Sequence, residues 1–195
     1  QNITENADRA FFHMVNGPER PVSNTLWGAL FGAPDGAQLG PSNYTSNAGF
    51  IGRLPQGAAN IPAWEKWEGP FTNRSRTRQP VSDGNSYTMA FGEHVGGLDG
   101  GLIGQGIIKM RDKLAWIGAG GLPTAWGIAN PVYMEAYDVI DTGHRWYRYG
   151  SEHPQVANFS RIDGSVASVQ KGVRVLDWRN FTGMNDRASF DLGNE

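Results

Sequence analysis

The chain of 195 residues contains no cysteine. This absence excludes disulfide bonds, zinc sites with cysteine ligands and a thiol nucleophile. It does not indicate a cellular compartment, because cytoplasmic proteins and exported proteins that fold without disulfides can both lack cysteine.

The chain also lacks an excess of charge of either sign and a long apolar run. Its net charge is -2, with acidic and basic residues interspersed, so no basic patch supports nucleic-acid binding. No run of about 18 apolar residues occurs, so we expect no membrane span in this chain.

Glycine, proline and aromatic residues are plentiful. The 27 glycines and 11 prolines make up about a fifth of the chain, and there are 7 Trp, 6 Tyr and 9 Phe. Aromatic side chains bury large areas, which argues against disorder. For this length we expect one domain over residues 1–195, of the α+β class but mainly β, with an antiparallel sheet and long loops rich in aromatic residues and glycine.

Two Asp-Gly pairs predict turns. Asp163-Gly164 separates two short strand-like runs and predicts a hairpin with a two-residue type I′ turn, in which both turn residues have positive φ. Asp83-Gly84 precedes residues 87–91, where large and small side chains alternate. This period of two predicts a half-buried strand, and we expect the hairpin to pair near it.

Five other segments carry weaker patterns. Residues 24–31 are predicted to form a strand, and residues 10–15 fit either one helical turn or a short strand. Residues 107–117 place apolar side chains at helical spacing but also suit a strand, so both alternatives stay open. Residues 173–178 are expected to be a final strand, and the polar residues 179–195 a loosely ordered surface tail.

Three blocks of residues, at 42–49, 81–93 and 151–166, follow one another in an order that is typical of a known family. The matching positions are Tyr44, Asn47 and Gly49 in the first block, Asp83, Gly84, Gly92 and Glu93 in the second, and Ser151, His153, Pro154, Asn158, Asp163, Gly164, Ser165 and Val166 in the third. The chain therefore resembles the planctomycete-type pseudopilin-like proteins, prepilin-type proteins named for a C-terminal His-x9-Asp-Gly signature. Two departures are Gln155-Val156, where the family usually has small residues, and Arg161, where it usually has an apolar one.

The resemblance implies a non-enzymatic structural subunit. Its globular head would be exported, to the periplasmic face, the cell surface or an extracellular filament linked to type II secretion or a similar system. It would pack against copies of itself or companion pilin-like subunits. Members normally begin with an apolar helix, which we expect here to be cleaved, omitted or supplied by a separate helix-bearing chain.

The sequence offers little support for catalysis or metal binding. His153 lies nine residues from His144, far from the spacing of a helical zinc pair, and opens a strand before a proline, which is typical of a structural residue. Asp163 is a candidate Ca²⁺ ligand, but no Asp-x-Asp-x-Asp-Gly loop accompanies it. No nucleophile motif occurs, so we expect no catalytic residue and no cofactor other than a possible calcium ion.

Aromatic residues in the loops are compatible with two different functions. As buried anchors they suit a subunit interface, and as exposed platforms they suit a sugar, so a carbohydrate-binding β-domain is the alternative function. The candidates are Trp64, Trp67, Trp126, Trp146 and Tyr147.

Overall fold

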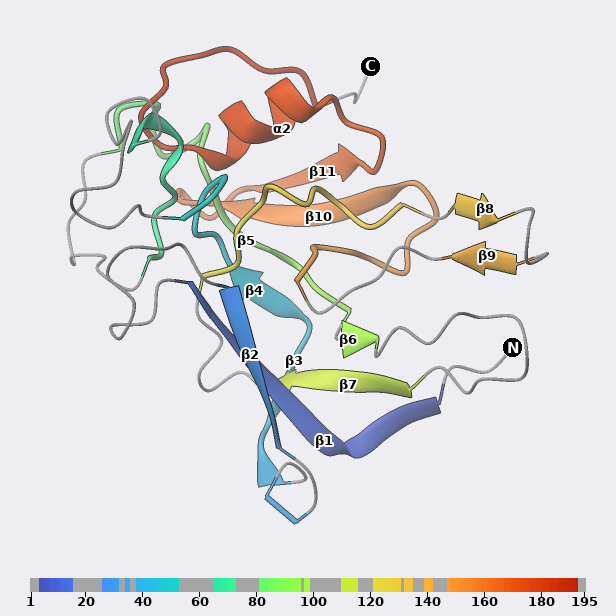
Figure 1. Cartoon of the computed structure of the whole chain (residues 1–195). Coiled ribbons are helices and arrows are strands. Elements are labelled where there is room, and N and C mark those ends of the chain that lie inside the picture. Colours follow the sequence, from blue (N-terminus) through green and yellow to red (C-terminus); the bar gives the residue numbers. More distant parts are fainter. Residues whose placement is uncertain are drawn as a thin grey trace.

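The computed structural model describes residues 4–15, 26–31, 34–35, 38–52, 65–72, 81–95, 97–98, 110–115, 121–130, 132–134, 139–141 and 147–192. In these ranges the chain forms mostly short strands and one α-helix (Figure 1). The elements are β1 Thr4–Val15, β2 Leu26–Phe31, β3 Pro41–Ser42, β4 Tyr44–Ser46, the 3-10 helix η2 Glu65–Trp67, β5 Met89–Glu93, β6 Gly97–Leu98, β7 Met110–Ala115, β8 Val132–Met134, β9 Val139–Asp141, β10 Val156–Arg161, β11 Val166–Gln170 and α2 Val175–Thr182.

The described strands form three sheets. The order in the four-stranded sheet is β11-β10-β5-β4, and all its neighbours are antiparallel. A second sheet has the order β2-β1-β7-β3, with β6 also on β7, and contains one parallel pair, β1 with β7. The pair β8-β9 stands apart. One helix with antiparallel sheet confirms the predicted α+β, mainly β class.

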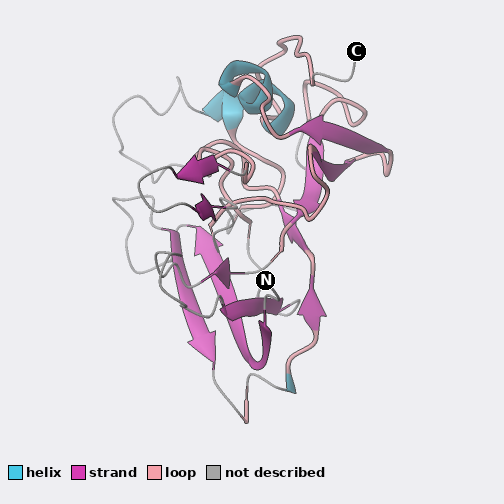
Figure 2. Cartoon of the chain, turned by 90° about the vertical axis from the view of Figure 1, so that its right-hand side faces the viewer, coloured by secondary structure: helices cyan, strands magenta, loops and turns pink. Residues whose placement is uncertain are grey.

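The helix α2 lies beside the four-stranded sheet, at the end of the molecule away from β1 and β2 (Figure 2). Between helix and sheet sits an aromatic core built from Tyr149, Phe159, Trp178 and Phe181. The Phe159 and Trp178 rings are 5.1 Å apart in an edge-to-face arrangement, a geometry that aromatic quadrupoles favour. This core fixes the position of β10 under α2.

The hairpin β10-β11 is confirmed, and it pairs with β5 as expected. Its turn is not type I′, because Gly164 has positive φ (+87°) and Asp163 does not. Gly164 N–H donates to Arg161 O (3.1 Å) and Arg161 N–H donates to Ser165 O (2.8 Å). These bonds define a three-residue loop closed by a glycine bulge, which needs only one residue with positive φ.

Strand β5 confirms the predicted half-buried strand for residues 89–91, while residues 87 and 88 lie before it, and its burial differs from a simple alternation. Met89 is fully buried, while Tyr87, in the turn before the strand, and Phe91 are exposed. The small residues of the strand are buried instead. They leave room for the aromatic core, since a Cβ at Gly92 would overlap the Phe159 ring. The aromatic core therefore packs on the small-residue side of β5.

Two other segments resolve alternatives from the sequence. The predicted strand at 24–31 is confirmed as β2, and residues 10–15 are the end of the long strand β1, not a helical turn. Residues 110–115 form strand β7, so the helical alternative is wrong there, because β7 pairs with β1, β3 and β6. The rest of 107–117 lies outside the described residues.

The predicted strand at 173–178 is wrong, because residues 175–182 form α2. The helix buries Asp177, Trp178, Phe181 and Thr182, a stripe with helical spacing, and exposes Val175 and Leu176. The packing of this buried stripe against the aromatic core outweighs the strand preference of the β-branched residues at the start of the helix.

The predicted loose surface tail is also wrong for residues 179–192. They complete α2 and then run back over the core, where Met184 and Leu192 are buried. We call residues 183–192 the C-terminal strap. Its composition is polar, and part of its attachment uses backbone groups, among them the Asp186 and Arg187 N–H groups that bond to Asp83.

Candidate functional site

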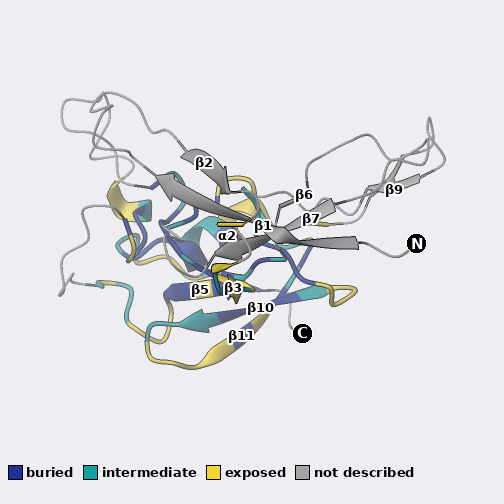
Figure 3. Cartoon of the chain, turned by 90° about the horizontal axis from the view of Figure 1, so that it is seen from below, coloured by how far each residue is buried: buried dark blue, intermediate teal, exposed yellow. Residues whose placement is uncertain are grey.

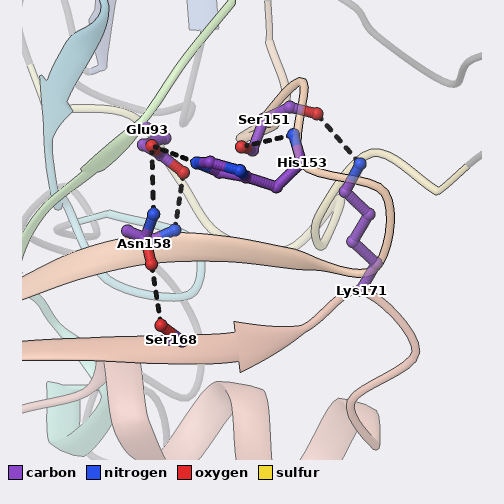
Figure 4. A network of polar contacts seen from close by, with 6 residues as sticks. All are labelled: Glu93, Ser151, His153, Asn158, Ser168 and Lys171. Carbon is purple, nitrogen blue, oxygen red and sulfur yellow. Dashed lines mark hydrogen bonds and ion pairs between the residues drawn. The ribbon is translucent and has the colours of Figure 1, made fainter.

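Several residues that carry the sequence signature meet at one end of the four-stranded sheet (Figure 4). They come from the end of β5, the loop before β10, the middle of β10 and β11, and the turn after β11. We call this group the signature cluster; it consists of Glu93, Ser151, His153, Asn158, Ser168 and Lys171.

Glu93 and Asn158 form the centre of the signature cluster. The register pairs Phe159 with Gly92, which places Asn158 next to Glu93. Asn158 N–H donates to Glu93 Oε2 (2.6 Å), and its side-chain Nδ2 donates to Oε1 (3.3 Å). The Glu93 carbonyl accepts the N–H of Gly150 instead (3.0 Å). One residue thus bonds through its side chain to β10 and through its backbone to the segment before it.

Asn158 extends the contact across the hairpin. Its Oδ1 accepts a hydrogen bond from Ser168 Oγ (2.8 Å) on β11, while its Nδ2 points to Glu93. An amide is suited to this place because it carries a donor and an acceptor on the same group. The row Glu93, Asn158, Ser168 therefore ties three adjacent strands together.

His153 lies at the rim of the signature cluster. Its Nε2 is 3.8 Å from Glu93 Oε1, and the imidazole is 57% exposed against 16% for the Glu93 side chain. The contact is an ion pair only when the imidazole is protonated. His153 N–H donates to Ser151 Oγ (3.1 Å), which shapes the loop that enters β10. This geometry suits the structural role expected for His153.

Lys171 closes the other side of the loop. Its Nζ donates to the Ser151 carbonyl oxygen (2.9 Å), and the residue is buried. Burial lowers the pKa of Lys171, and the carboxylates of Glu152 and Glu93 partly oppose this by favouring the charged amine. Lys171 could not be identified from the sequence, because it lies outside the three blocks.

The two Asp-Gly turns lie side by side, away from the signature cluster. Asp163 N–H donates to Asn85 O (3.2 Å), which joins the hairpin turn to the turn after Asp83. The Asp163 carboxylate accepts bonds from Ser165 N–H (2.9 Å) and Ser165 Oγ (2.7 Å). Side-chain and backbone bonds from Ser165, with a further bond from Ser86, lower the pKa of Asp163 to about 2.

Asp83 binds the C-terminal strap. Its carboxylate accepts the N–H groups of Asp186 (3.1 Å) and Arg187 (2.8 Å), and Arg187 has a positive φ of 55°. Gly84 beside it has φ +94°, which glycine adopts without strain. The second block therefore serves to hold a segment about 100 residues further along the chain.

Asn47, in the first block, is a fully buried residue that connects three segments. Its Nδ2 donates to Met89 O (2.9 Å) in β5 and to Thr182 O (2.8 Å) at the end of α2. Its Oδ1 accepts Gly49 N–H (2.6 Å). The sequence pattern included Asn47 but did not indicate that its amide links sheet and helix.

The aromatic candidates differ in exposure. Trp126 is 43% exposed and its ring lies 5.4 Å from that of Tyr147, edge to face. Trp67 lies under the Arg179 guanidinium (3.8 Å from its centroid) and near Lys66 Nζ (4.3 Å), so cations occupy the space over its ring. Trp64 and Trp146 lie outside the described residues.

Across the described ranges, no three His, Asp or Glu side chains gather in a way that could hold a metal ion. A Ca²⁺ ion at Asp163 stays a prediction, and the residues shown here supply no ligand set for it. Among the helices of those same ranges, none has the length and apolar character needed to cross a membrane.

The fold and the signature cluster together define a class: a mainly β domain in which a short polar motif locks a loop and a hairpin to a central strand. The chain belongs to a family described as "Protein of unknown function (DUF1559)", whose profile matches residues 5–173. That match covers all three sequence blocks. No curated protein and no solved structure matches the chain significantly.

Proposed function

We propose that this chain is the globular head of a pilin-like structural subunit. It is exported and works by packing against copies of itself or companion pilin-like subunits in a filament or a secretion-linked surface structure. The support is the resemblance of the three blocks together with a family match that spans them.

The observation that carries the proposal is how the signature residues are used. Glu93, Asn158 and Ser168 bond to one another, and Asp83 and Asp163 bond to backbone groups of the same chain. Catalytic groups are instead held in a cleft with free positions for substrate. A motif whose residues bond within the chain fits a structural head, which needs a stable shape and no catalytic group.

Apolar side chains on the outward face of the sheet support a packing role. The register places Ser46, Phe91, Ser160 and Val166 in one row across the four strands. Phe91 and Val166 are exposed, as is Tyr44 in the neighbouring row, and Phe71 packs on Phe91 with ring centroids 4.9 Å apart. Exposed apolar side chains that gather on one face are typical of contact surfaces.

The alternative, a carbohydrate-binding β-domain, rests on the exposed Trp126 and the half-buried Tyr147 beside it. An exposed indole supported by a second ring offers a flat apolar face for a sugar. A glycan array separates the two functions. A packing subunit gives no signal above background, whereas a sugar-binding domain gives a signal that Trp126→Ala abolishes.

Antibody labelling of cells that produce the protein tests the main proposal. An antibody raised against the folded chain should label intact cells along filaments or in surface clusters, and chemical cross-linking there should yield multimers. Label that appears only after the cells are permeabilised, with the chain recovered as a monomer, would overturn it.

A further inference from the structure

Strand β11 forms an open edge of the four-stranded sheet. Within the described residues it pairs with β10 alone. Figure 3 shows β11 at the outer rim of the molecule, and in that view no other segment lies beyond it. The opposite edge is closed, because Ser46 O accepts Leu122 N–H (2.8 Å) and Asn47 bridges to Leu122.

The backbone groups that face the open edge follow from the hairpin register. Arg161 N–H donates to Ser165 O, so this pair is hydrogen-bonded and the pairs alternate from there. Ala167 and Val169 consequently point their N–H and C=O groups at β10, while Val166 and Ser168 point theirs outward. Gln170 N–H also points outward and donates to Leu192 O (3.4 Å) in the C-terminal strap.

Among the described residues, none of the usual features protects the open edge against strand pairing. Proteins blunt exposed edges with charged residues, proline, bulges or a covering segment. Residues 166–170 read Val-Ala-Ser-Val-Gln, without charge or proline, and pair with β10 without a bulge. The strap reaches only the Gln170 end. Val166 at the other end is 67% exposed.

We propose that β11 pairs antiparallel with β11 of a second copy, about a two-fold axis at Ala167. In this register Val166 of each copy lies opposite Ser168 of the other. The N–H and C=O groups of Val166 and Ser168 in the two copies then form four hydrogen bonds, and none of these groups is left over. The neighbouring register, centred on Ser168, would need Gln170 N–H, which already donates to Leu192.

A second copy fits this edge better than an unrelated strand because the edge complements itself. A two-fold axis places Ala167 against Ala167 of the second copy, and the small side chain permits the close approach of a pair without hydrogen bonds. The neutral sequence brings no like charges together across the axis. The result is a continuous sheet of eight strands. This inference rests on the proposed function and names the surface used for self-association.

Proline and alanine at position 168 test the edge. Ser168→Pro removes an outward N–H and the side-chain hydroxyl, but it removes no backbone bond to β10, since edge strands tolerate proline on their solvent side. Ser168→Ala is the matched control, because it removes the same hydroxyl and keeps the N–H. Sedimentation velocity of the purified chain should show a dimer for wild type and Ser168→Ala. Ser168→Pro should raise the dimer dissociation constant at least about tenfold.

Single cysteines test the register, because the natural chain has none. Residues paired across strands have Cα atoms about 5.5 Å apart, within the range for a disulfide, whereas Val166 of the two copies would be separated diagonally by about 8 Å. A mixture of Val166→Cys and Ser168→Cys should therefore oxidise to a mixed dimer faster than either variant alone.

The outcomes separate this inference from the proposed function. Circular dichroism and thermal unfolding establish that each variant folds, and a misfolded Ser168→Pro is replaced by Val166→Pro, whose N–H also faces outward. Self-association that both proline variants leave unchanged overturns the β11 interface while the pilin-like function stands. A chain that stays monomeric at all concentrations also overturns the interface. Absence of the protein from the cell surface overturns the function, whatever β11 does.

Discussion

The Glu93 carboxylate takes the place of a backbone hydrogen-bond acceptor in the sheet. At the end of β5 its carbonyl oxygen turns to Gly150, and its carboxylate accepts the N–H of Asn158 that a continuing strand would have bonded. The His153 ring makes only a long contact to the same carboxylate. The bonds therefore predict an uneven importance within the motif.

Removing the Glu93 carboxylate should cost more stability than removing the His153 ring. Glu93→Ala leaves the Asn158 N–H and amide without their acceptor in a partly buried place, which costs about 1–3 kcal/mol. His153→Ala removes a largely exposed contact and should cost under about 0.5 kcal/mol. Urea unfolding of both variants measures the difference. A larger loss for His153→Ala would contradict this account of the motif.

Asp163 makes the stability of the hairpin depend on acid pH. Its pKa in the folded chain is about 2, below the ordinary 3.8, so the folded state binds a proton less readily than the unfolded state. The carboxylate therefore stabilises the fold above about pH 4, and this contribution is lost as the pH falls through about 2.

Asp163→Asn should flatten the loss of stability between about pH 4 and pH 2, because the amide does not titrate. The free energy of unfolding, measured by denaturant at several pH values, tests this. Ser165→Ala removes one of the bonds to the carboxylate and should give an intermediate slope. Parallel curves for wild type and Asp163→Asn would show that Asp163 has no such role.

At the scale of the element, the Asp-Gly turns could be predicted from the sequence, whereas α2 could not. The Asp-Gly turns and the strands around them could be predicted because their signals are local: glycine permits positive φ, and side chains alternate. The start of α2, Val173-Arg-Val-Leu-Asp-Trp178, reads as a strand by composition. Its helical stripe appears only when Phe181 and Thr182 are included, and the core that selects it comes from β10 and Tyr149.

Two alanine substitutions on α2 test the assigned face of the helix. Phe181 is fully buried and contacts Phe159, Trp178 and Phe190, so Phe181→Ala should destabilise the chain by about 3–5 kcal/mol. Leu176 is 60% exposed on the same helix, so Leu176→Ala should change stability by less than about 0.5 kcal/mol. Thermal and urea unfolding compare them. Similar losses for both would mean that α2 is oriented differently.

At the scale of the whole molecule, the hydrogen bonds between distant segments could not be predicted from the sequence. Asn47 reaches Thr182, and Asp83 reaches Asp186, each across more than a hundred residues. A polar residue of this kind looks the same in a sequence whether it faces water or holds a buried backbone group. The motif residues of the candidate site could thus be named, but the pairing of Glu93 with Asn158 and the contribution of Lys171 could not.

The C-terminal strap is a second case in which long-range contacts could not be predicted. Its polar sequence resembles a surface tail, but in the structure it covers the aromatic core. Phe190 packs on Phe181 with ring centroids 5.3 Å apart, Leu192 is buried, and Asp191 N–H donates to the Asp177 carboxylate (3.2 Å). Burying each large apolar side chain contributes about 1.5–3 kcal/mol. Met184 is a second buried side chain of the strap beside Leu192, and Phe190 is partly buried.

A chain that ends at Thr182 should therefore lose most of its stability, since a domain has only about 5–15 kcal/mol in total. The matched control ends at Leu192 and keeps the strap. Near-UV circular dichroism should show fixed aromatic packing in the control, whereas the shorter chain should lose it and unfold at much lower temperature. Equal melting temperatures for the two would mean that the strap is dispensable and that the aromatic core is complete without it.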